Sequence, residues 1–385
     1  MIQSAYIHIP FCHHICHYCD FTKIFYNESM ANDYIEALGK EMSICLPEVK
    51  SKIRTIFIGG GTPTALNLAQ LEKLLQLIHQ YFDVASCEEF TIEANPGDFT
   101  EEKIRLLKHF GVNRVSLGVQ VFDNQLLKAI GRAHQVQDVY RSINDLTKNE
   151  FKNISIDLIY ALPHQTVANF EATVKEALSF QLPHYSAYSL QVEPQTIFYN
   201  RYQKGDLHRP EQEEEVKMYN ILRKNMAHQG LKQYEISNFA KPSYESKHNL
   251  TYWNNEYYYG FGAGASSYLP GKRMMNIRAI PAYMKQANKH NLPVMKVDTI
   301  GLKERLEEEF FLGLRKRSGI NKRQFNEKFG FPYDRIYKKQ VKELIRKNWL
   351  VEDCDSIRLT EEGLLFGNDV FQYFLLDEQE INHVN

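Results

Sequence analysis

Short apolar stretches alternate with longer amphipathic ones in the first half of the chain. Six stretches are rich in β-branched or aromatic residues and end at polar or glycine residues, as buried strands do. Their ranges are 5–9, 55–59, 89–94, 114–120, 153–160 and 184–190. Between them apolar residues recur at helical spacing, for example Leu71, Leu74, Leu75, Ile78 and Phe82, and then Ile104, Leu107 and Phe110. The pattern predicts six strand–helix units, in either a parallel βα barrel or an open doubly wound sheet.

The positions of reactive residue types favour the barrel. A cysteine cluster at 12–19, the GGGTP of 59–63, Glu93, Gln120 and Asp157 all fall at or just beyond the ends of successive predicted strands. A βα barrel gathers its site from these strand ends, whereas a doubly wound sheet concentrates ligands at one switch point. We therefore predict an α/β fold with a partial (β/α)6 TIM-type barrel. Six units instead of eight leave the barrel open, so another part of the chain must close it.

The alternation stops after about residue 195. Segment 200–230 is charged and helical, 231–270 is rich in Tyr, Asn and Gly, and 300–385 has the pattern of a separate small unit. In that unit, helices near 303–316, 321–329 and 334–347 precede two short strands around a polar turn within 348–363. This pattern is typical of a helical or winged-helix domain, which we interpret as a structural cap. The basic helix at 338–347 leaves DNA binding as an alternative. The predicted domains are 1–235, 236–298 and 299–385.

Composition and charge exclude several classes of protein. The chain is 43% hydrophobic and 24% charged, and its 46 basic and 47 acidic residues give a net charge of −1. No global basic field indicates a nucleic-acid partner, so none is expected. The sequence shows neither a signal leader nor an apolar run long enough to span a membrane, which predicts a cytoplasmic protein.

Three of the six cysteines stand close together, in CHHICHYCDF at residues 12–21. The other three are scattered singly, as small buried hydrophobes often are. Zinc held by Cys12, Cys16, Cys19 and a nearby histidine (His8, His13, His14 or His17) is as well supported by spacing alone as an iron–sulfur cluster. In a [4Fe–4S] cubane, three cysteines leave one iron open. An open iron is a place for chemistry.

The glycine-rich turn downstream changes that balance. Three glycines at the end of a strand let a ligand approach the backbone closely, and an ordinary tight turn seldom needs three. CxxxCxxC after the first strand, followed by GGGTP after the second, resembles the radical S-adenosylmethionine (SAM) superfamily. The resemblance implies that the amino and carboxylate groups of SAM chelate the open iron. An electron from the cluster then breaks a carbon–sulfur bond and releases a 5′-deoxyadenosyl radical.

Further motifs narrow the resemblance. YIHIPFC, IGGGTPT, EANP, GVQ, GRAH and DLIYALP are similar to motifs of the oxygen-independent coproporphyrinogen III dehydrogenase (HemN-like) family, from about Tyr6 to the end of the chain. By this resemblance, Tyr6, Gly60 and Glu93 contact the cluster-bound SAM. The positions that hold a second SAM molecule in the dehydrogenase are Tyr18, Gly61, Thr62, Gln120, Arg132 and Asp157. An ordinary ion pair at the barrel mouth is the alternative for Arg132 and Asp157.

Two departures point away from the dehydrogenase itself. That enzyme carries a fourth cysteine where this chain has Phe21, and a long N-terminal extension, whereas here the first cysteine is residue 12. HNLTYW at 248–253 matches the HNxxYW motif of the family's heme-chaperone branch. The resemblance therefore implies a heme-binding chaperone with a [4Fe–4S] cluster, SAM and heme, which passes heme to respiratory-chain acceptor proteins, with a membrane location of the acceptors left open.

His248 is the predicted heme ligand, at the mouth of the barrel. It stands in an aromatic, weakly charged segment, unlike the other 13 of the 14 histidines. From the residues alone, His248 and Asn249 could instead cap a loop over the barrel while Tyr252 and Trp253 pack a lid. Two other functions stay open: oxidative decarboxylation of coproporphyrinogen III, and a DNA-binding regulator that uses the cluster as a sensor. No catalytic residue is assigned, and the sequence leaves the oligomeric state unknown.

Overall fold

All six predicted strands form, and they pair in parallel in the order of the sequence. The computed structural model describes residues 2–47 and 49–377. The strands are β1 (Ser4–Ile9), β5 (Thr55–Gly60), β7 (Glu89–Ala94), β8 (Arg114–Gln120), β9 (Asn153–Tyr160) and β10 (His184–Ser189). Pairs such as Ile7 with Ile58 and Asp157 with Ser186 fix the register. The carboxyl ends of all six strands therefore meet at one edge, and the partial barrel is confirmed.

Three short strands extend the sheet to nine. β13 (Tyr259–Phe261) pairs in parallel with β1 at one edge, while β12 (Asn238–Ala240) pairs antiparallel with β10 and carries β11 (Lys232–Gln233) at the other. Separate small pairings join β2 (Phe11–Cys12) to β3 (Ile24–Phe25) and β4 (Ser51–Lys52) to β6 (Phe82–Asp83). β14 (Ser266–Leu269), β15 (Lys272–Asn276) and β16 (Val294–Thr299) form a three-stranded antiparallel sheet.

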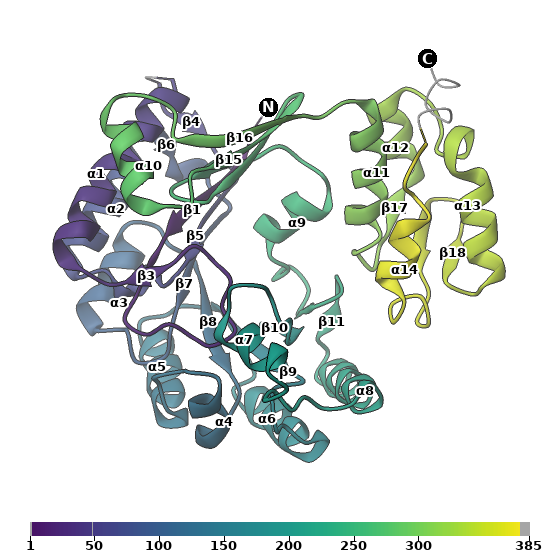
Figure 1. The fold of residues 1–385 in the computed structure, drawn as a ribbon, viewed down its shortest axis with the longest axis horizontal. Helices are drawn as coiled ribbons and strands as arrows, with labels where there is room; N and C mark the ends of the chain where they lie inside the picture. The colour runs from purple at the N-terminus through teal and green to yellow at the C-terminus, as the bar shows by residue number, and fades with distance from the viewer. Residues whose placement is uncertain (1, 48, 378–385) are drawn as a thin grey trace.

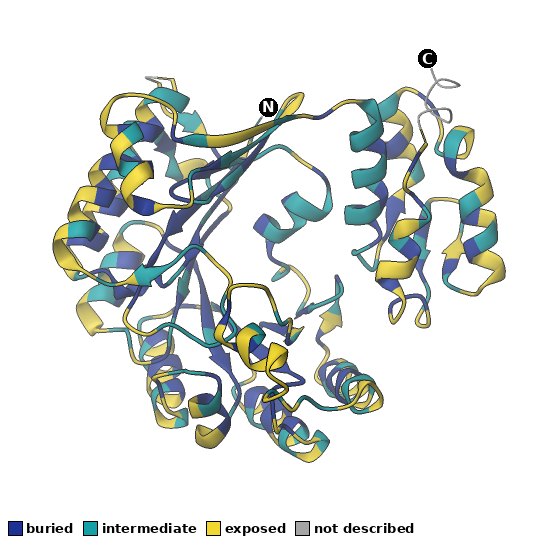
Figure 2. Ribbon diagram, viewed as in Figure 1, coloured by how far each residue is buried: buried dark blue, intermediate teal, exposed yellow. Residues whose placement is uncertain are grey.

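Helices cover the outer face of the sheet (Figure 1). They are α1 (Glu28–Cys45), α2 (Leu68–Tyr81), α3 (Glu101–His109), α5 (Val136–Lys148), α6 (Val167–Ser179), α8 (Gln212–His228) and α10 (Ile280–Asn288). The short helices α4 (Asn124–Ala129) and α7 (Ile197–Gln203) pack together in a separate apolar cluster. In α2 the predicted residues Leu71, Leu74, Leu75 and Ile78 are all buried, and Asn67 caps the first turn. Figure 2 shows the same division, with buried strands inside and exposed helix faces outside. Each large buried side chain contributes about 2 kcal/mol to folding.

One helix lies on the inner face of the sheet. This is α9 (Lys247–Trp253), which carries the HNLTYW sequence and stands between the sheet and the C-terminal helices (Figure 1). The Thr251 hydroxyl meets the Ser4 hydroxyl of β1 at 2.9 Å, and the His248 ring stacks on Phe57 of β5. The inward side chains of β1 and β5 are thus covered by a helix instead of by further strands.

The C-terminal unit has its own apolar core. It contains α11 (Leu302–Gly313), β17 (Ile320–Asn321), α12 (Lys322–Phe329), α13 (Asp334–Arg346), β18 (Leu350–Glu352), β19 (Ser356–Leu359) and α14 (Gly367–Gln372). The three predicted helices and the two predicted strands are confirmed, and β17 adds a third strand. The first core extends to Ala287 and the second begins at Leu306. The predicted boundary between 235 and 236 stays a prediction; there β11 and β12 pair within one sheet.

Among residues 2–47 and 49–377, no helix combines the length and the apolar character that crossing a bilayer requires.

Candidate functional site

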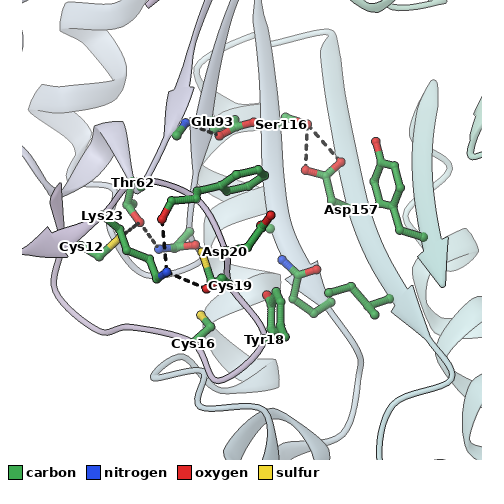
Figure 3. Close-up of a pocket in the computed structure, with 18 of the residues that line it drawn as sticks. Cys12, Cys16, Tyr18, Cys19, Asp20, Lys23, Thr62, Glu93, Ser116 and Asp157 are labelled. Carbon is green, nitrogen blue, oxygen red and sulfur yellow. Dashed lines mark hydrogen bonds between the residues drawn. The ribbon is translucent and has the colours of Figure 1, made fainter. Parts of the chain in front are cut away.

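A cavity of about 430 Å³, which we call the cluster cavity, opens at the carboxyl ends of the parallel strands. Figure 3 shows residues that line it. Eleven of the thirteen site residues predicted from sequence line it: Cys12, Cys16, Tyr18, Cys19, Gly60, Gly61, Thr62, Glu93, Gln120, Arg132 and Asp157. Tyr6 and His248 do not belong to this lining. The geometry thus brings together residues of the four strands β5, β7, β8 and β9, of the loop that holds the cysteines, of the turn after β5 and of the segment after α4.

The three cysteines lie on one loop, which we call the cluster loop (residues 12–23). Its two ends are held together because β2 pairs with β3. The Lys23 ammonium donates to the carbonyl of Cys19 at 2.6 Å and to that of Phe21 at 3.2 Å, which folds the loop back on itself. From the next strand along the sheet, the Thr62 hydroxyl donates to Cys12 Sγ at 3.6 Å. The loop is therefore held by its backbone, and its thiols face the cavity (Figure 3).

The glycine turn is required by the cluster loop itself. Gly60 has φ of +115°, and a Cβ there would lie 2.4 Å from the His8 ring. A Cβ on Gly61 would lie 2.8 Å from the backbone of Pro10 and 3.0 Å from Cys12 Sγ. Because no side chain fits at either position, the turn lets the cluster loop approach the end of β5 closely. This close approach involves the chain's own residues, and the approach of a ligand to the turn stays a prediction.

Burial changes the pKa of two of the three thiols, those of Cys12 and Cys19. Burial raises the pKa of Cys12 to about 11, although the hydrogen bond from Thr62 opposes the shift. Burial also raises the pKa of Cys19, against the opposing charge of Lys23. Both thiols are therefore protonated near neutral pH when no metal is bound. Assembly of a metal site on these residues would release these protons, because thiolates are the ligands.

The donor set fits a cubane cluster better than a zinc ion. In residues 2–47 and 49–377, no three His, Cys, Asp or Glu side chains converge on a point where one ion would sit. A cubane does not require such convergence, because each thiolate binds a different iron. Two histidines that could complete a zinc site are bound elsewhere: His8 Nε2 to the carbonyl of Thr22 at 2.7 Å, and His17 Nδ1 to that of Ala129 at 3.0 Å.

Arg132 and Asp157 do not pair with each other, so the ion-pair alternative is not what the structure shows. Arg132 donates to Cys16 Sγ at 3.4 Å, to Asn95 Oδ1 at 2.7 Å and to the carbonyl of Gly118. A guanidinium at this position would offset the negative charge of cluster thiolates. Asp157 instead accepts hydrogen bonds from the Ser116 hydroxyl, at 2.9 and 3.1 Å, and from that of Ser155 at 3.3 Å.

Two buried carboxyl groups face the cavity. Burial raises the pKa of Glu93 to about 8, even though Gly60 N–H donates to its Oε2 at 3.0 Å. The pKa of Asp157 is also raised by burial, against three serine hydroxyls that donate to it. Burial removes the water that would stabilise the ionised form of these carboxyl groups. A cationic ligand in the cavity would stabilise that form instead.

Tyr6 lies in the middle of β1, away from the cavity. Its hydroxyl meets His8 Nδ1 at 3.0 Å, and its ring stacks on Phe57. Tyr6 therefore stands behind His8, whose ring packs closely against Gly60. A contact with SAM stays a prediction for this residue.

The expected location of His248 at the barrel mouth is wrong. Its Nδ1 meets the hydroxyl of Thr55, the first residue of β5, at 2.9 Å, whereas the cluster cavity opens beside the last residue, Gly60, and α9 reaches its lining only at Asn249. The cause is that Glu89, the first residue of β7, accepts from the backbone N–H of Lys247 at 2.8 Å and of His248 at 3.0 Å. This carboxylate fixes the N-terminus of α9 at the opposite end of the strands.

His248 is enclosed and neutral. It is 1% exposed, and its Nε2 meets the Tyr252 hydroxyl at 2.8 Å. Burial, helped by the charge of Arg114, lowers its pKa to about 3. The neutral imidazole is the form that binds iron, but both ring nitrogens are engaged in the structure. Its role as a heme ligand stays a prediction that requires α9 to rearrange.

Several lining residues were missed from the sequence, among them Arg114, Ser116, Ser186 and Tyr188. One signal could have found Arg114. Along β8, residues 114, 116, 118 and 120 alternate to the same face, and Gln120 on that face was already a candidate. A charged residue in phase with a site residue, inside an otherwise apolar strand, indicates a second site residue.

Comparisons with known proteins agree with this geometry. Residues 6–177 match the Radical SAM superfamily, and residues 300–366 match the HemN C-terminal domain. The chain is 46% identical over 376 residues to a protein of Bacillus subtilis named "Heme chaperone HemW", covering 97% of this chain and 99% of the relative. A protein of the same name from Synechocystis is 36% identical over 331 residues, covering 83% of this chain and 79% of the relative.

A solved structure has the same fold. It is titled "Coproporphyrinogen III oxidase (HemN) from Escherichia coli is a Radical SAM enzyme" and superposes with a TM-score of 0.84 at 22% identity. The match covers 97% of this chain and 90% of that one. The likeness therefore includes both the partial barrel and the C-terminal unit.

Proposed function

Because this chain belongs to the heme chaperone HemW family, we propose that it is a heme-binding chaperone that carries a [4Fe–4S] cluster and binds SAM. The observation that carries the proposal is the arrangement of three thiols and two buried carboxyls around one cavity, with a neutral histidine held in a separate helix. The first group suits a cluster and a cationic cofactor. The second suits the iron of heme.

The cluster cavity would hold the iron–sulfur cluster and SAM. Cys12, Cys16 and Cys19 would bind three irons, and the fourth iron with SAM supplies reductive carbon–sulfur cleavage when both are bound. Thr62 and Arg132 each donate to a cysteine sulfur and so orient and neutralise the thiolates. The carboxyls of Glu93 and Asp157 would hold the positive charge of the cofactor.

Heme would bind beside α9, with His248 as its protein ligand. On the far side of Tyr252 lies an aromatic cavity of about 370 Å³, lined by Tyr252, Trp253, Tyr258, Tyr268 and Phe311 among others. If Tyr252 releases His248 Nε2, the imidazole can reach toward a macrocycle bound against these rings. Flat aromatic walls supply the apolar area that binds such a ligand. The acceptor that would receive heme, at a membrane or elsewhere, belongs to this same proposal.

A heme titration tests the proposal. We expect the anaerobically prepared wild-type chain to bind one hemin per chain and to pass it to an added apo-heme protein. In His248→Ala the Soret band should shift and the affinity should fall by about tenfold, since one axial bond is lost while the apolar contacts stay. His228→Ala is the matched control, because His228 is exposed on α8. Identical spectra and affinities in all three proteins would remove His248 from the heme site.

An enzymatic assay separates this function from that of the dehydrogenase. We expect no conversion of coproporphyrinogen III to protoporphyrinogen IX with cluster, SAM and reductant present. Phe21, which is 58% exposed at the edge of the cavity, stands where the dehydrogenase has its fourth cysteine. Robust turnover in that assay would show that the chain is the enzyme.

A further inference from the structure

Arg114 is a buried cation that lines the cluster cavity without a bonding partner. It is the first residue of β8. At 2% exposure, it has the largest of the fully buried side chains among the described residues. Within residues 2–47 and 49–377, its guanidinium takes part in no hydrogen bond or ion pair, and Nε is enclosed without a partner. The other Lys and Arg side chains of the lining, Lys23 and Arg132, both donate to neighbouring groups.

Neither of the nearby carboxyl groups, Glu93 and Asp157, forms an ion pair with Arg114. The charge of Arg114 opposes the rise in pKa that burial causes at Glu93 and Asp157, so the three groups interact electrostatically. Glu93, however, accepts from Gly60 N–H, and Asp157 accepts from Ser116 and Ser155. An arginine cannot lose its charge in a protein, and a buried charge without bonded partners is costly. The donors of Arg114 are therefore left for a group that enters the cavity.

The form of the guanidinium selects the chemistry of that group. Its planar donors match a carboxylate through two parallel hydrogen bonds. The two neighbouring carboxyls would repel a dianion such as a phosphate more strongly than a monoanionic carboxylate. Phe57, Ile159 and Leu190 add apolar walls to the same cavity, which suits a ligand that carries its carboxylate on an apolar or mixed body.

We propose that Arg114 forms a carboxylate-binding subsite at the inner end of the cluster cavity. The proposal deepens the proposed function and rests on it, because the carboxylate comes from a ligand of that function. Two sources share this chemistry: the methionine carboxylate of a SAM molecule that does not chelate the cluster iron, and a propionate of a tetrapyrrole. Asn249 of α9 lines the same cavity, so the subsite adjoins this helix.

Two matched ligand pairs distinguish the sources. In one arm, SAM and decarboxylated SAM are titrated into the cluster-loaded wild type and Arg114→Gln. In the other, mesoporphyrin and its dimethyl ester are titrated into the same two proteins. We expect Arg114→Gln to lose about tenfold to a hundredfold in affinity for the free acid of one pair, and to bind the carboxylate-free partner as the wild type does. Arg114→Lys keeps the positive charge but not the paired planar donors of the guanidinium, so its loss of affinity for the free acid should be smaller.

Controls separate this subsite from the function on which it rests. Arg141→Gln removes an exposed arginine of α5 and should change none of the affinities. Equal losses for acid and carboxylate-free ligand in both arms would overturn the subsite, as would no loss in either. If Arg114→Gln does not fold, the same comparison on Arg114→Lys decides, because an unchanged preference for the acid overturns the proposal. A wild type that binds neither SAM nor porphyrin would instead overturn the proposed function.

Discussion

The cluster loop and α9 carry the two most recognisable motifs of the chain, and the fold treats them in opposite ways. The cluster loop lies at the open end of the barrel, with Cys16 and Cys19 only partly buried. α9 lies against the inner face of the sheet, with His248 bonded at both ring nitrogens. Groups that line an open cavity can receive a ligand directly. A group inside a bonded helix can do so only after some of its contacts break.

The restraints on α9 come from both the barrel and the C-terminal unit. Glu89 of the barrel accepts from backbone N–H groups at its N-terminus. At its C-terminus, Lys316 donates to Asn254 Oδ1 at 2.7 Å, and Lys328 donates to the carbonyl of Asn255 at 3.0 Å. Negative charge at the start of a helix and positive charge at its end both stabilise it. Heme binding at His248, as proposed, would therefore carry a conformational cost that assembly of a cluster on the cysteines would not.

The largest expected effect tests the open end of this comparison. Cys16→Ser should abolish the cluster, because one of only three thiolate ligands is lost. Iron and acid-labile sulfide per chain, measured after anaerobic reconstitution, should fall almost to zero. Folding should persist, because no buried apolar contact is removed.

Cys354→Ser is the matched control, since Cys354 is exposed in the turn between β18 and β19. It should retain the wild-type content of iron and sulfide. Stoichiometric zinc without sulfide in the wild-type chain would contradict the cluster assignment.

The next effect concerns pH at the same end. Burial puts the pKa of Glu93 at about 8, so the carboxyl is mostly protonated below that pH. A cationic ligand favours the carboxylate, so affinity for SAM should rise by about tenfold per pH unit as pH approaches 8 and level off above it. Glu93→Gln should remove this part of the slope, and titrations between about pH 6.5 and 9 would measure it. Glu213→Gln, on the exposed first turn of α8, should keep the wild-type profile. A parallel profile in Glu93→Gln would show that Glu93 does not contact the charge.

Features that depend on local sequence could be predicted well. The six strands and the helix α2 follow from periodicity, and each falls within a few residues of its predicted range. The cluster loop and the glycine turn adjoin in the sheet because β1 and β5 are neighbouring parallel strands, which the strand order already implies. Eleven candidate residues consequently meet in one cavity.

Features that depend on contacts between distant parts of the chain could not be predicted from the sequence. HNLTYW was expected at the mouth, yet the position of α9 is set by Glu89, which lies 158 residues earlier than Lys247. Arg114 was missed because its strand reads as apolar, and its lack of a partner becomes visible only when the surrounding strands are in place. Sequence thus identified the residue types of α9 without showing that they are packed and bonded.

The smallest expected effect tests whether α9 must loosen before heme binds. Lys328→Met removes the ammonium that donates to the carbonyl of Asn255 and pairs with Glu309 at 2.5 Å, so it weakens the link between α9 and the C-terminal unit. One such contact contributes about 1 kcal/mol, and if opening limits the reaction, heme should associate about fivefold faster while the cluster content stays unchanged. Stopped-flow mixing with hemin measures the rate, and Lys339→Met, an equal loss of charge on the exposed face of α13, is the control. If Lys328→Met binds heme at the wild-type rate while its free energy of unfolding falls by the expected amount, the contact stabilises the fold without limiting access to His248.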